Sequence, residues 1–229
     1  MHQPTAPSAG WAPEARRVLT ALRADRVLAV VRAASLVDAQ GLCASLVDGG
    51  IRVVELTFTI PDLARHLTVA TRSAAQCGAL VGAGTVRTAG HARVAVDAGA
   101  QFLVTPGLGE ASAEIVQIGH AAGAAVVLGA LTPSEVLSAI QQGADAVKIF
   151  PARLGGPQLF TDLRGPFPDA HLLPSGGVTA DNAQAYLDAG ALAVSAGTSV
   201  VPPTAVQSSD WASITDSAKK FCAALSSTT

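Results

Sequence analysis

Cysteine is scarce in this chain, which has only Cys43, Cys77 and Cys222 among 229 residues. Their odd number, wide spacing and lack of a Cys-x-x-Cys pair argue against a disulfide framework and against a zinc site. The five histidines are also scattered, and no two of them lie at metal-ligand spacing beside a carboxylate. We therefore expect reduced thiols, as in cytoplasmic proteins, and no bound metal.

Charge is also scarce: 14% of the residues are charged, and the formal net charge is −2. This balance gives no basic surface for nucleic acid or for an anionic membrane. No apolar run approaches the ~20 residues of a membrane-spanning helix. The opening, MHQPTAPSAGWAP, has neither the basic nor the apolar region of a signal peptide. We expect a cytoplasmic protein that binds neither nucleic acid nor membrane, with residues 1–12 as a flexible segment.

Small apolar residues are abundant instead. The apolar fraction is 49%, mostly Ala, Val and Leu, whereas aromatic residues make up only 4%. A chain of this length and composition can bury a large core within one domain, which we expect to span residues 13–229. Many small side chains favour close packing of helices on strands.

A glycine repeat organises the chain. Six times a helical pattern ends at a glycine and a strand-like segment follows, with spacings of 28, 21, 24, 20 and 47 residues. Glycine is the usual residue where the backbone turns left-handed after a helix, and the spacing is that of a repeated strand–helix unit with a parallel sheet. The glycines are Gly50, Gly78, Gly99, Gly123, Gly143 and Gly190.

Counting these units predicts eight strands, which would close a (β/α)8 TIM-type barrel; a doubly wound open sheet is the alternative. The expected strands are 27–31, 51–56, 79–83, 101–104, 125–128, 145–149, 170–173 and 191–195. Capping residues predict helix starts at Ser35, Thr88, Thr132 and Thr179. Extra helices are expected near 13–25, before the first strand, and near 210–225, after the last.

Active sites of such barrels lie at the carboxyl ends of the strands. The polar or special residues expected there are Arg32, Glu55, Thr85, Pro106, Lys148, Gly176, Gly177, Gly197 and Thr198. Lys148 is the most unusual, because the other two lysines, Lys219 and Lys220, both lie in the last expected helix.

Lys148 interrupts the strand ADAVKIF, whose alternation predicts that it faces the barrel interior. Interior lysines are rare without a function, although a lysine that reaches the rim is the alternative. Apolar walls disfavour the ammonium form and favour a nucleophilic neutral amine. The same alternation directs Glu55 inward, as a candidate general acid/base or as a structural partner of an arginine or of Lys148. A carboxylate close to the lysine would oppose the effect of burial.

Two glycine turns predict an anion site. LPSGGVTADN reads as strand, turn and helix N-terminus, and AVSAGTSVV gives a second turn after the next strand. Backbone N–H groups of these two loops commonly bind phosphate in such barrels, and plain turn geometry is the alternative. GAGTVR is not a dinucleotide fingerprint, because the third glycine would fall on Arg87.

Together, nine segments resemble the 2-keto-3-deoxy-6-phosphogluconate aldolase family, including members that also cleave 4-hydroxy-2-oxoglutarate. They span roughly residues 25–203 and are AVVRAAS, GGIRVVELTFTIPD, VGAGTV, GAQFLVTPGL, LTPSEV, GADAVKIFPA, GPF, LPSGGVTADN and AGTS. The resemblance implies a class I aldolase without a dissociable cofactor, typically a homotrimer, that releases pyruvate and either glyceraldehyde 3-phosphate or glyoxylate.

The resemblance also implies residue roles. Lys148 would form the Schiff base and Glu55 would act as acid/base. Arg32 and Thr85 would lie near the substrate carboxylate, and Pro106 would form a pocket wall. The residues implied around the phosphate are Ser175, Gly176, Gly177, Gly197 and Thr198.

The chain departs from the family pattern at a few positions. It has Thr59 where some members have arginine, so Arg32 would bind more of the anion. Leu128 stands where others have proline, and Ala196 and Thr198 stand where glycine and serine are usual. Two other functions stay open: a cofactor-free phosphosugar isomerase or epimerase with Glu55 as base, and a non-catalytic sugar-acid-binding barrel.

Overall fold

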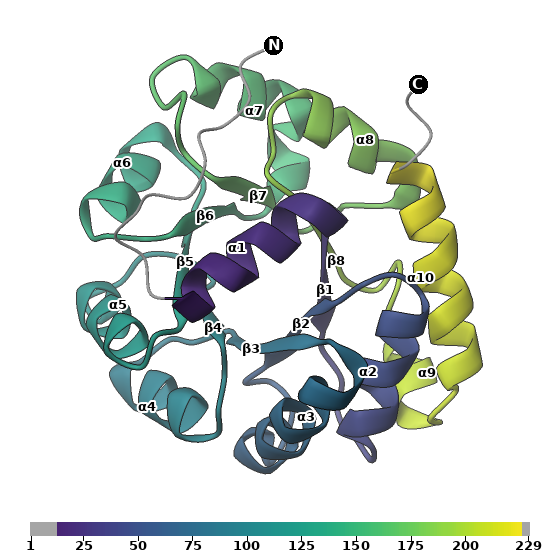
Figure 1. Ribbon diagram of the computed structural model, residues 1–229. Helices are drawn as coiled ribbons and strands as arrows, with labels where there is room; N and C mark the ends of the chain where they lie inside the picture. Colours follow the sequence, from purple (N-terminus) through teal and green to yellow (C-terminus); the bar gives the residue numbers. More distant parts are fainter. Residues whose placement is uncertain (1–12, 226–229) are drawn as a thin grey trace.

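The computed structural model describes residues 13–225 and shows eight parallel strands alternating with helices in a nearly closed barrel (Figure 1). The expected flexible segment 1–12 lies outside the described residues. The strands are β1 (Val27–Val31), β2 (Val53–Thr57), β3 (Leu80–Gly84), β4 (Phe102–Val104), β5 (Ala125–Ala130), β6 (Ala146–Ile149), β7 (Leu172–Pro174) and β8 (Val194–Ala196).

Helices surround this sheet, with a 3₁₀ turn (Ala152–Leu154) after β6. The helices of the described part are α1 (Pro13–Asp25), α2 (Ala39–Asp48), α3 (Leu63–Cys77), α4 (Ala89–Asp97), α5 (Ser112–Ala121), α6 (Pro133–Gln141), α7 (Gly156–Arg164), α8 (Ala180–Asp188), α9 (Pro203–Gln207) and α10 (Trp211–Leu225). The expected first and last helices are therefore confirmed. The short α9 was not expected.

Strand order distinguishes the barrel from an open sheet. The strands follow one another in sequence order from β1 to β7, and β8 pairs with β1 rather than with an outer strand. A doubly wound sheet would reverse direction at a switch point, so this alternative is wrong. The seam between β7 and β8 has no ladder in the described structure, and the Leu192 N–H donates one hydrogen bond of 2.8 Å to the Leu172 carbonyl across it.

The glycine repeat has the expected geometry. All six glycines have positive φ, between 78° and 95°, as the end of a helix requires. In most units the next residue still belongs to the helix end: the Ile51 N–H donates to the Leu46 carbonyl, and the Ala191 N–H donates to the Tyr186 carbonyl. These bonds explain why β2 and β8 begin two and three residues later than expected, at Val53 and Val194.

Three of the four expected helix starts are confirmed, since Thr88, Thr132 and Thr179 are the N-cap residues of α4, α6 and α8. The start at Ser35 is wrong. Asp38 caps α2 instead, and its carboxylate accepts a 2.9 Å hydrogen bond from the Gly41 N–H. A carboxylate at this position also interacts favourably with the helix dipole.

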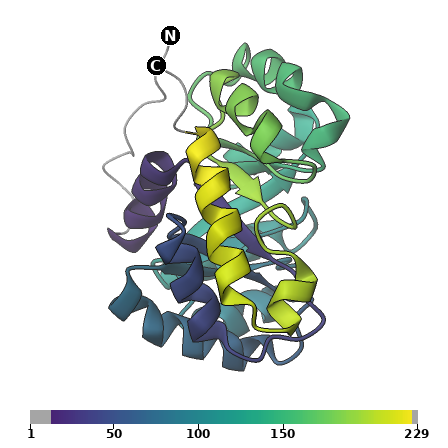
Figure 2. The same cartoon turned by 90° about the vertical axis from the view of Figure 1, so that its right-hand side faces the viewer.

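Two hydrophobic cores position the site. The larger lies between the barrel and the outer helices, and the smaller fills the barrel interior and includes Val18, Leu19 and Leu22 of α1. Helix α1 thus lies across one end of the barrel (Figures 1 and 2). Because this helix covers the amino ends of the strands, side chains at the carboxyl ends can meet a ligand only from the opposite side.

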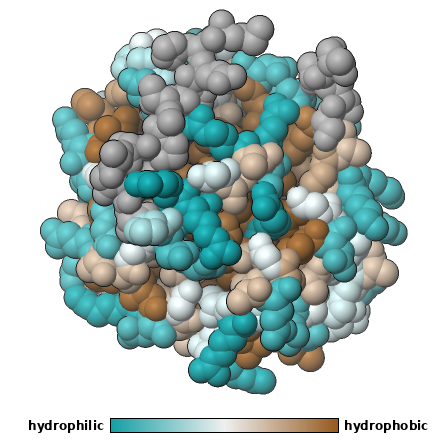
Figure 3. Space-filling view, in the orientation of Figure 1, coloured by the Kyte–Doolittle hydropathy of each residue, from teal (hydrophilic) through white to brown (hydrophobic). Residues whose placement is uncertain are grey.

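Polar and apolar residues are interspersed on the face that carries α1 (Figure 3). Among residues 13–225, no helix combines the length and the apolar character needed to cross a bilayer.

Candidate active site

A cavity of about 420 Å³ opens at the carboxyl ends of the strands. It brings together every residue that was expected at these ends except Glu55, which is fully buried. Its lining is Val30, Arg32, Thr85, Pro106, Lys148, Phe150, Ser175, Gly176, Gly177, Val178, Thr179, Ser195, Gly197, Thr198 and Ser199.

Lys148 faces the barrel interior, as the alternation of β6 predicted. It is only 6% exposed, Ala146 belongs to the inner core, and Val147 and Ile149 belong to the outer one. The ammonium nitrogen, Nζ, lies 5.5 Å from the centroid of the Phe150 ring. Buried lysines of this kind are poor structural elements, because a charged amine loses its hydration, but they are suited to nucleophilic chemistry.

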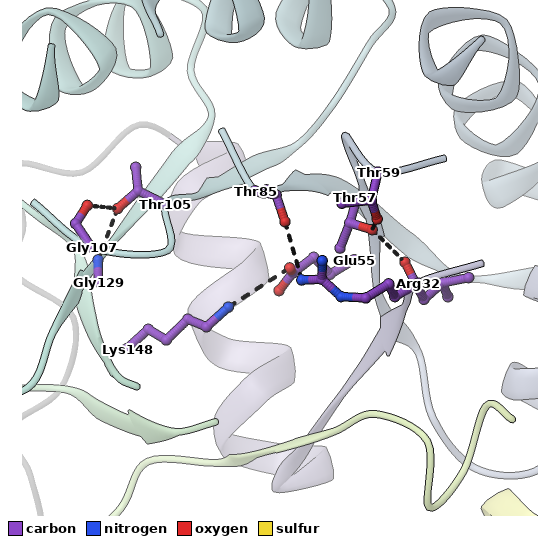
Figure 4. A network of polar contacts seen from close by, with 10 residues as sticks. Arg32, Glu55, Thr57, Thr59, Thr85, Thr105, Gly107, Gly129 and Lys148 are labelled. Atoms are coloured by element: carbon purple, nitrogen blue, oxygen red, sulfur yellow. Dashed lines mark hydrogen bonds and ion pairs between the residues drawn. The ribbon is translucent and has the colours of Figure 1, made fainter. Parts of the chain in front are cut away.

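Glu55 projects inward from β2 toward Lys148 (Figure 4). Its Oε1 atom lies 3.9 Å from Lys148 Nζ, which is ion-pair distance but beyond hydrogen-bond distance. Neither carboxylate oxygen has a hydrogen-bond partner within the described residues. Burial raises the pKa of Glu55, and the nearby positive charges of Lys148 and Arg32 oppose that shift. A carboxyl group whose pKa is raised in this way can serve as a general acid as well as a general base.

Two glycines of β3 make room for these inward side chains. A Cβ atom at Gly84 would lie 1.8 Å from Glu55 Oε1, and one at Gly82 would lie 2.4 Å from the Phe102 ring. The segment VGAGTV, one of the nine that carry the family resemblance, therefore has a spatial function. Its glycines are needed because neighbouring strands project large side chains across them.

Arg32 and Thr85 lie together above Glu55. The Arg32 guanidinium donates to Thr85 Oγ1 at 3.4 Å, and Arg32 is exposed to the cavity (Figure 4). Thr85 has φ of +58°, a left-handed conformation that is strained for a β-branched residue. Such strain is concentrated at ligand-binding sites. The pair offers a cation and a hydroxyl to a carboxylate.

Thr59, which stands where some family members have arginine, is not part of the cavity lining. Its hydroxyl forms a 2.7 Å hydrogen bond with that of Thr57, which in turn donates to the Val31 carbonyl at 2.9 Å. Arg32 is thus the one arginine that lines this cavity within the described part of the chain.

Gly129, at the end of β5, follows the other departure, Leu128. A Cβ at Gly129 would lie 2.4 Å from the Gly107 backbone nitrogen, so only glycine fits. The Gly129 N–H donates to Thr105 Oγ1 at 2.8 Å, which fixes the loop that carries Pro106 (Figure 4). Leu128 itself is buried in the outer core, facing away from the cavity.

The two glycine turns form the far wall of the cavity. Gly176 and Gly177 both have positive φ, +86° and +88°, and lead into α8. A Cβ at Gly177 would also lie 2.7 Å from that of Arg153. The second turn, Gly197–Thr198, follows β8, and a Cβ atom at Gly197 would have no neighbouring atom within 4 Å among the described residues. Together these turns and the Ser175 and Thr198 side chains can offer backbone N–H groups and hydroxyls to an anion.

Some lining residues were missed. The alternation of ADAVKIF puts Phe150, which directly follows β6, on the same face as Lys148, although it was not named as a site residue. Ser195 lies on β8 between Val194 and Ala196 of the outer core, so strand alternation could have found it as well. Val30, Val178, Thr179 and Ser199 also line the cavity. Within residues 13–225, no three His, Cys, Asp or Glu side chains are grouped to hold a metal ion.

Comparisons with known proteins agree with this geometry. The sequence model of the family described as "KDPG and KHG aldolase" matches residues 18–217. The 2-dehydro-3-deoxy-phosphogluconate aldolase of Pseudoalteromonas atlantica is 34% identical over 80% of this chain and 83% of its own. The KHG/KDPG aldolase of Escherichia coli is 29% identical over 92% of this chain and 95% of its own.

One similar solved structure holds pyruvate bound covalently to its protein. The KDPG aldolase of Legionella pneumophila, described "with pyruvate captured at low pH as a covalent carbinolamine intermediate", superposes with a TM-score of 0.78 and 28% identity. The match covers 88% of this chain and 96% of that one.

Proposed function

This chain belongs to the KDPG and KHG aldolase family, and from that premise we propose that it cleaves 2-keto-3-deoxy-6-phosphogluconate through a Schiff base on Lys148. The shorter 4-hydroxy-2-oxoglutarate is the second substrate. One observation carries the proposal: the described part of the chain has a single buried lysine, and it faces a buried carboxyl group at 3.9 Å inside an open cavity.

The neutral Lys148 amine adds to the C2 carbonyl, and the resulting carbinolamine loses water to give an iminium ion. The C4 hydroxyl loses its proton, the electron pair of the C3–C4 bond moves onto the iminium, and C4 leaves as an aldehyde. The remaining enamine takes a proton at C3, and hydrolysis releases pyruvate and the free amine. A lysine can perform this chemistry without a dissociable cofactor.

Glu55 carries the protons in this scheme. It accepts the proton of the C4 hydroxyl and returns one to C3, so that the overall reaction consumes none. Burial raises the pKa of Glu55, so the protonated form is less unfavourable than for an exposed carboxyl group. The group can therefore give a proton as well as accept one.

The two ends of the cavity suit the two ends of the substrate. We assign the carboxylate to Arg32 and Thr85, with Pro106 as a wall, because a guanidinium and a hydroxyl meet there at 3.4 Å. We assign the phosphate to the turns at Ser175, Gly176, Gly177, Gly197 and Thr198. Anions bind at such turns through backbone N–H groups that point to one spot.

We also propose that the active form is a homotrimer, by resemblance to the family. A second proposal is that the protein acts in the cytoplasm. The second proposal follows from the substrate, because a phosphorylated sugar acid carries charges that do not cross a bilayer unaided. Light scattering on the purified protein gives the oligomeric state directly.

Borohydride trapping tests the mechanism. Incubation with pyruvate and sodium borohydride should inactivate the protein and add one reduced pyruvate at Lys148, found by peptide mass in AVKIFPAR. Lys219 and Lys220 are the internal controls, because both are exposed on α10 and should stay unmodified. Lys148→Arg should abolish labelling and cleavage, since a guanidinium does not form an imine. Labelling spread equally over all three lysines would exclude the Schiff base and favour an isomerase.

A further inference from the structure

One buried hydroxyl in the candidate active site, that of Ser195, has no hydrogen-bond partner among the described residues. Ser195 is 3% exposed, and its neighbours Val194 and Ala196 belong to the outer core, so its side chain faces the barrel interior. Its Oγ atom is shielded from solvent and meets no donor or acceptor among residues 13–225. A buried hydroxyl without a hydrogen-bond partner is costly, because it has lost its contacts with water and gained none in the protein. A ligand that supplies the missing hydrogen bond would remove this cost.

The position of Ser195 indicates which part of a ligand it meets. It lines the same cavity as Lys148 and precedes the Gly197–Thr198 turn by two residues on β8. Along a strand that separation is roughly 6.6 Å. A substrate that is bound covalently at Lys148 and held by its phosphate at the turn therefore passes Ser195 with its middle carbons.

We propose that Ser195 is a specificity-determining residue, whose hydroxyl binds the C5 hydroxyl of a 2-keto-3-deoxy-6-phospho sugar acid. The inference rests on the proposed aldolase function. In that reaction the C4 hydroxyl must face Glu55, which takes its proton, and C3 carries no oxygen. The C5 hydroxyl is then the neutral polar group left between the reacting carbons and the phosphate. A serine hydroxyl can donate to it or accept from it.

This assignment also ranks the substrates. The 5-deoxy analogue of the phosphorylated acid has no oxygen on C5, so it leaves the Ser195 hydroxyl unpaired, whereas the C5 carboxylate of 4-hydroxy-2-oxoglutarate can still accept a hydrogen bond from that hydroxyl. Sites built to pair with a substrate hydroxyl discriminate against analogues that lack it, for the same reason that an orphaned polar group is costly. The chain should therefore prefer 2-keto-3-deoxy-6-phosphogluconate to its 5-deoxy analogue.

A four-corner kinetic experiment tests the contact directly. kcat/KM is measured for the wild type and Ser195→Ala, each with 2-keto-3-deoxy-6-phosphogluconate and with its 5-deoxy analogue. We expect Ser195→Ala to lower kcat/KM about five- to tenfold on the natural substrate, the effect of one neutral hydrogen bond, and less than twofold on the analogue. An equal loss on both substrates, or no loss on either, would overturn the assignment.

Two controls separate this role from a structural one. Without substrate, Ser195→Ala should leave the Tm unchanged or raise it, because the deleted hydroxyl has no partner; a lower Tm would indicate a structural role instead. Ser45→Ala removes another buried hydroxyl, which already donates to the Leu42 carbonyl at 2.8 Å, and should leave the ratio between the two substrates unchanged. If the wild type releases pyruvate from neither substrate, the aldolase function itself fails. Activity on both with parallel losses rejects Ser195 alone.

Discussion

At the residue scale, Glu55 shows how a group suited to proton transfer, which we propose as the general acid/base, can weaken the fold that holds it. Its carboxylate is completely buried, both oxygens are without partners in the described structure, and the nearest cation is beyond hydrogen-bond distance. Burial therefore dominates the balance and raises the pKa of Glu55 above its ordinary value of 4.5. Such a group is available for proton transfer because the protein does not satisfy it.

The raised pKa predicts how stability depends on pH. Below pH 4.5 Glu55 is protonated in both the folded and the unfolded chain. As the pH rises, the unfolded chain ionises first, so the folded state loses stability until the pH passes the higher, folded pKa. Glu55→Gln cannot ionise and should escape this loss. The Tm of the variant minus that of the wild type should thus grow between pH 4 and pH 8, by about 2–4 °C per kcal/mol.

Thermal unfolding across this pH range measures the difference, and pyruvate release by the same variant should be nearly lost. A Tm difference that shrinks as the pH rises would mean that Lys148 and Arg32 hold Glu55 ionised, against the direction inferred from its burial.

At the scale of elements, β3 determines whether the carboxyl group on β2 has room. Because a Cβ at Gly84 would overlap Glu55 Oε1, Gly84→Ala must displace the carboxylate. We expect kcat/KM for pyruvate release to fall by about a hundredfold or more, as when a general acid/base is lost. Gly90→Ala is the matched control: it lies in α4, its Cβ would have room, and alanine favours a helix. Full activity in Gly84→Ala would contradict the assigned role of Glu55.

Helix α1 belongs to the interior core rather than to the outer layer of helices. Leu22 is buried against the inward side chains of the strands. Leu22→Ala should lower the free energy of unfolding by about 2–5 kcal/mol, the usual cost of a cavity, as measured by urea denaturation. Arg17→Ala, on the exposed side of α1, should cost at most about 1 kcal/mol, because its ion pair with Glu14 is a surface one. Similar losses for both variants would show that α1 does not seal the barrel.

The elements also show what a sequence can reveal. Glycine spacing marked six of the eight strands, and strand-like runs at 27–31 and 170–173 supplied the other two; before β1 the left-handed residue is Arg26, with φ of +60°, so no glycine marks that strand. Glycine spacing misplaced strand starts, because the residue after the glycine still donates to a helix carbonyl. Alternation along β6 and β2 predicted that Lys148 and Glu55 face inward. It did not reveal why Gly84 is needed or that the Ser195 hydroxyl is unpaired, since both depend on atoms from other strands.

For the whole molecule, the seam between β7 and β8 is the least bonded part of the barrel wall. Amide groups there should exchange with deuterium faster than those of the central strands, because only one backbone hydrogen bond spans the gap among the described residues. The turns that we assign to phosphate follow these same two strands. A phosphorylated ligand bound to both turns should slow exchange at residues 172–174 and 192–196 more than pyruvate alone. Equal protection by both ligands would place the phosphate elsewhere.

The same seam would give the phosphate that we assign to these turns a mechanical function. Gly176 and Gly177 follow β7 on one side of the gap, and Gly197 follows β8 on the other. A phosphate that accepts hydrogen bonds from both turns would bridge the two strands and hold the barrel closed. Part of the binding free energy of the phosphate would then stabilise the contact between β7 and β8, and the measured affinity would be lower by that amount. A substrate too short for its anionic group to reach both turns would not bridge β7 and β8. The barrel wall at this gap would then fluctuate more while that substrate is bound.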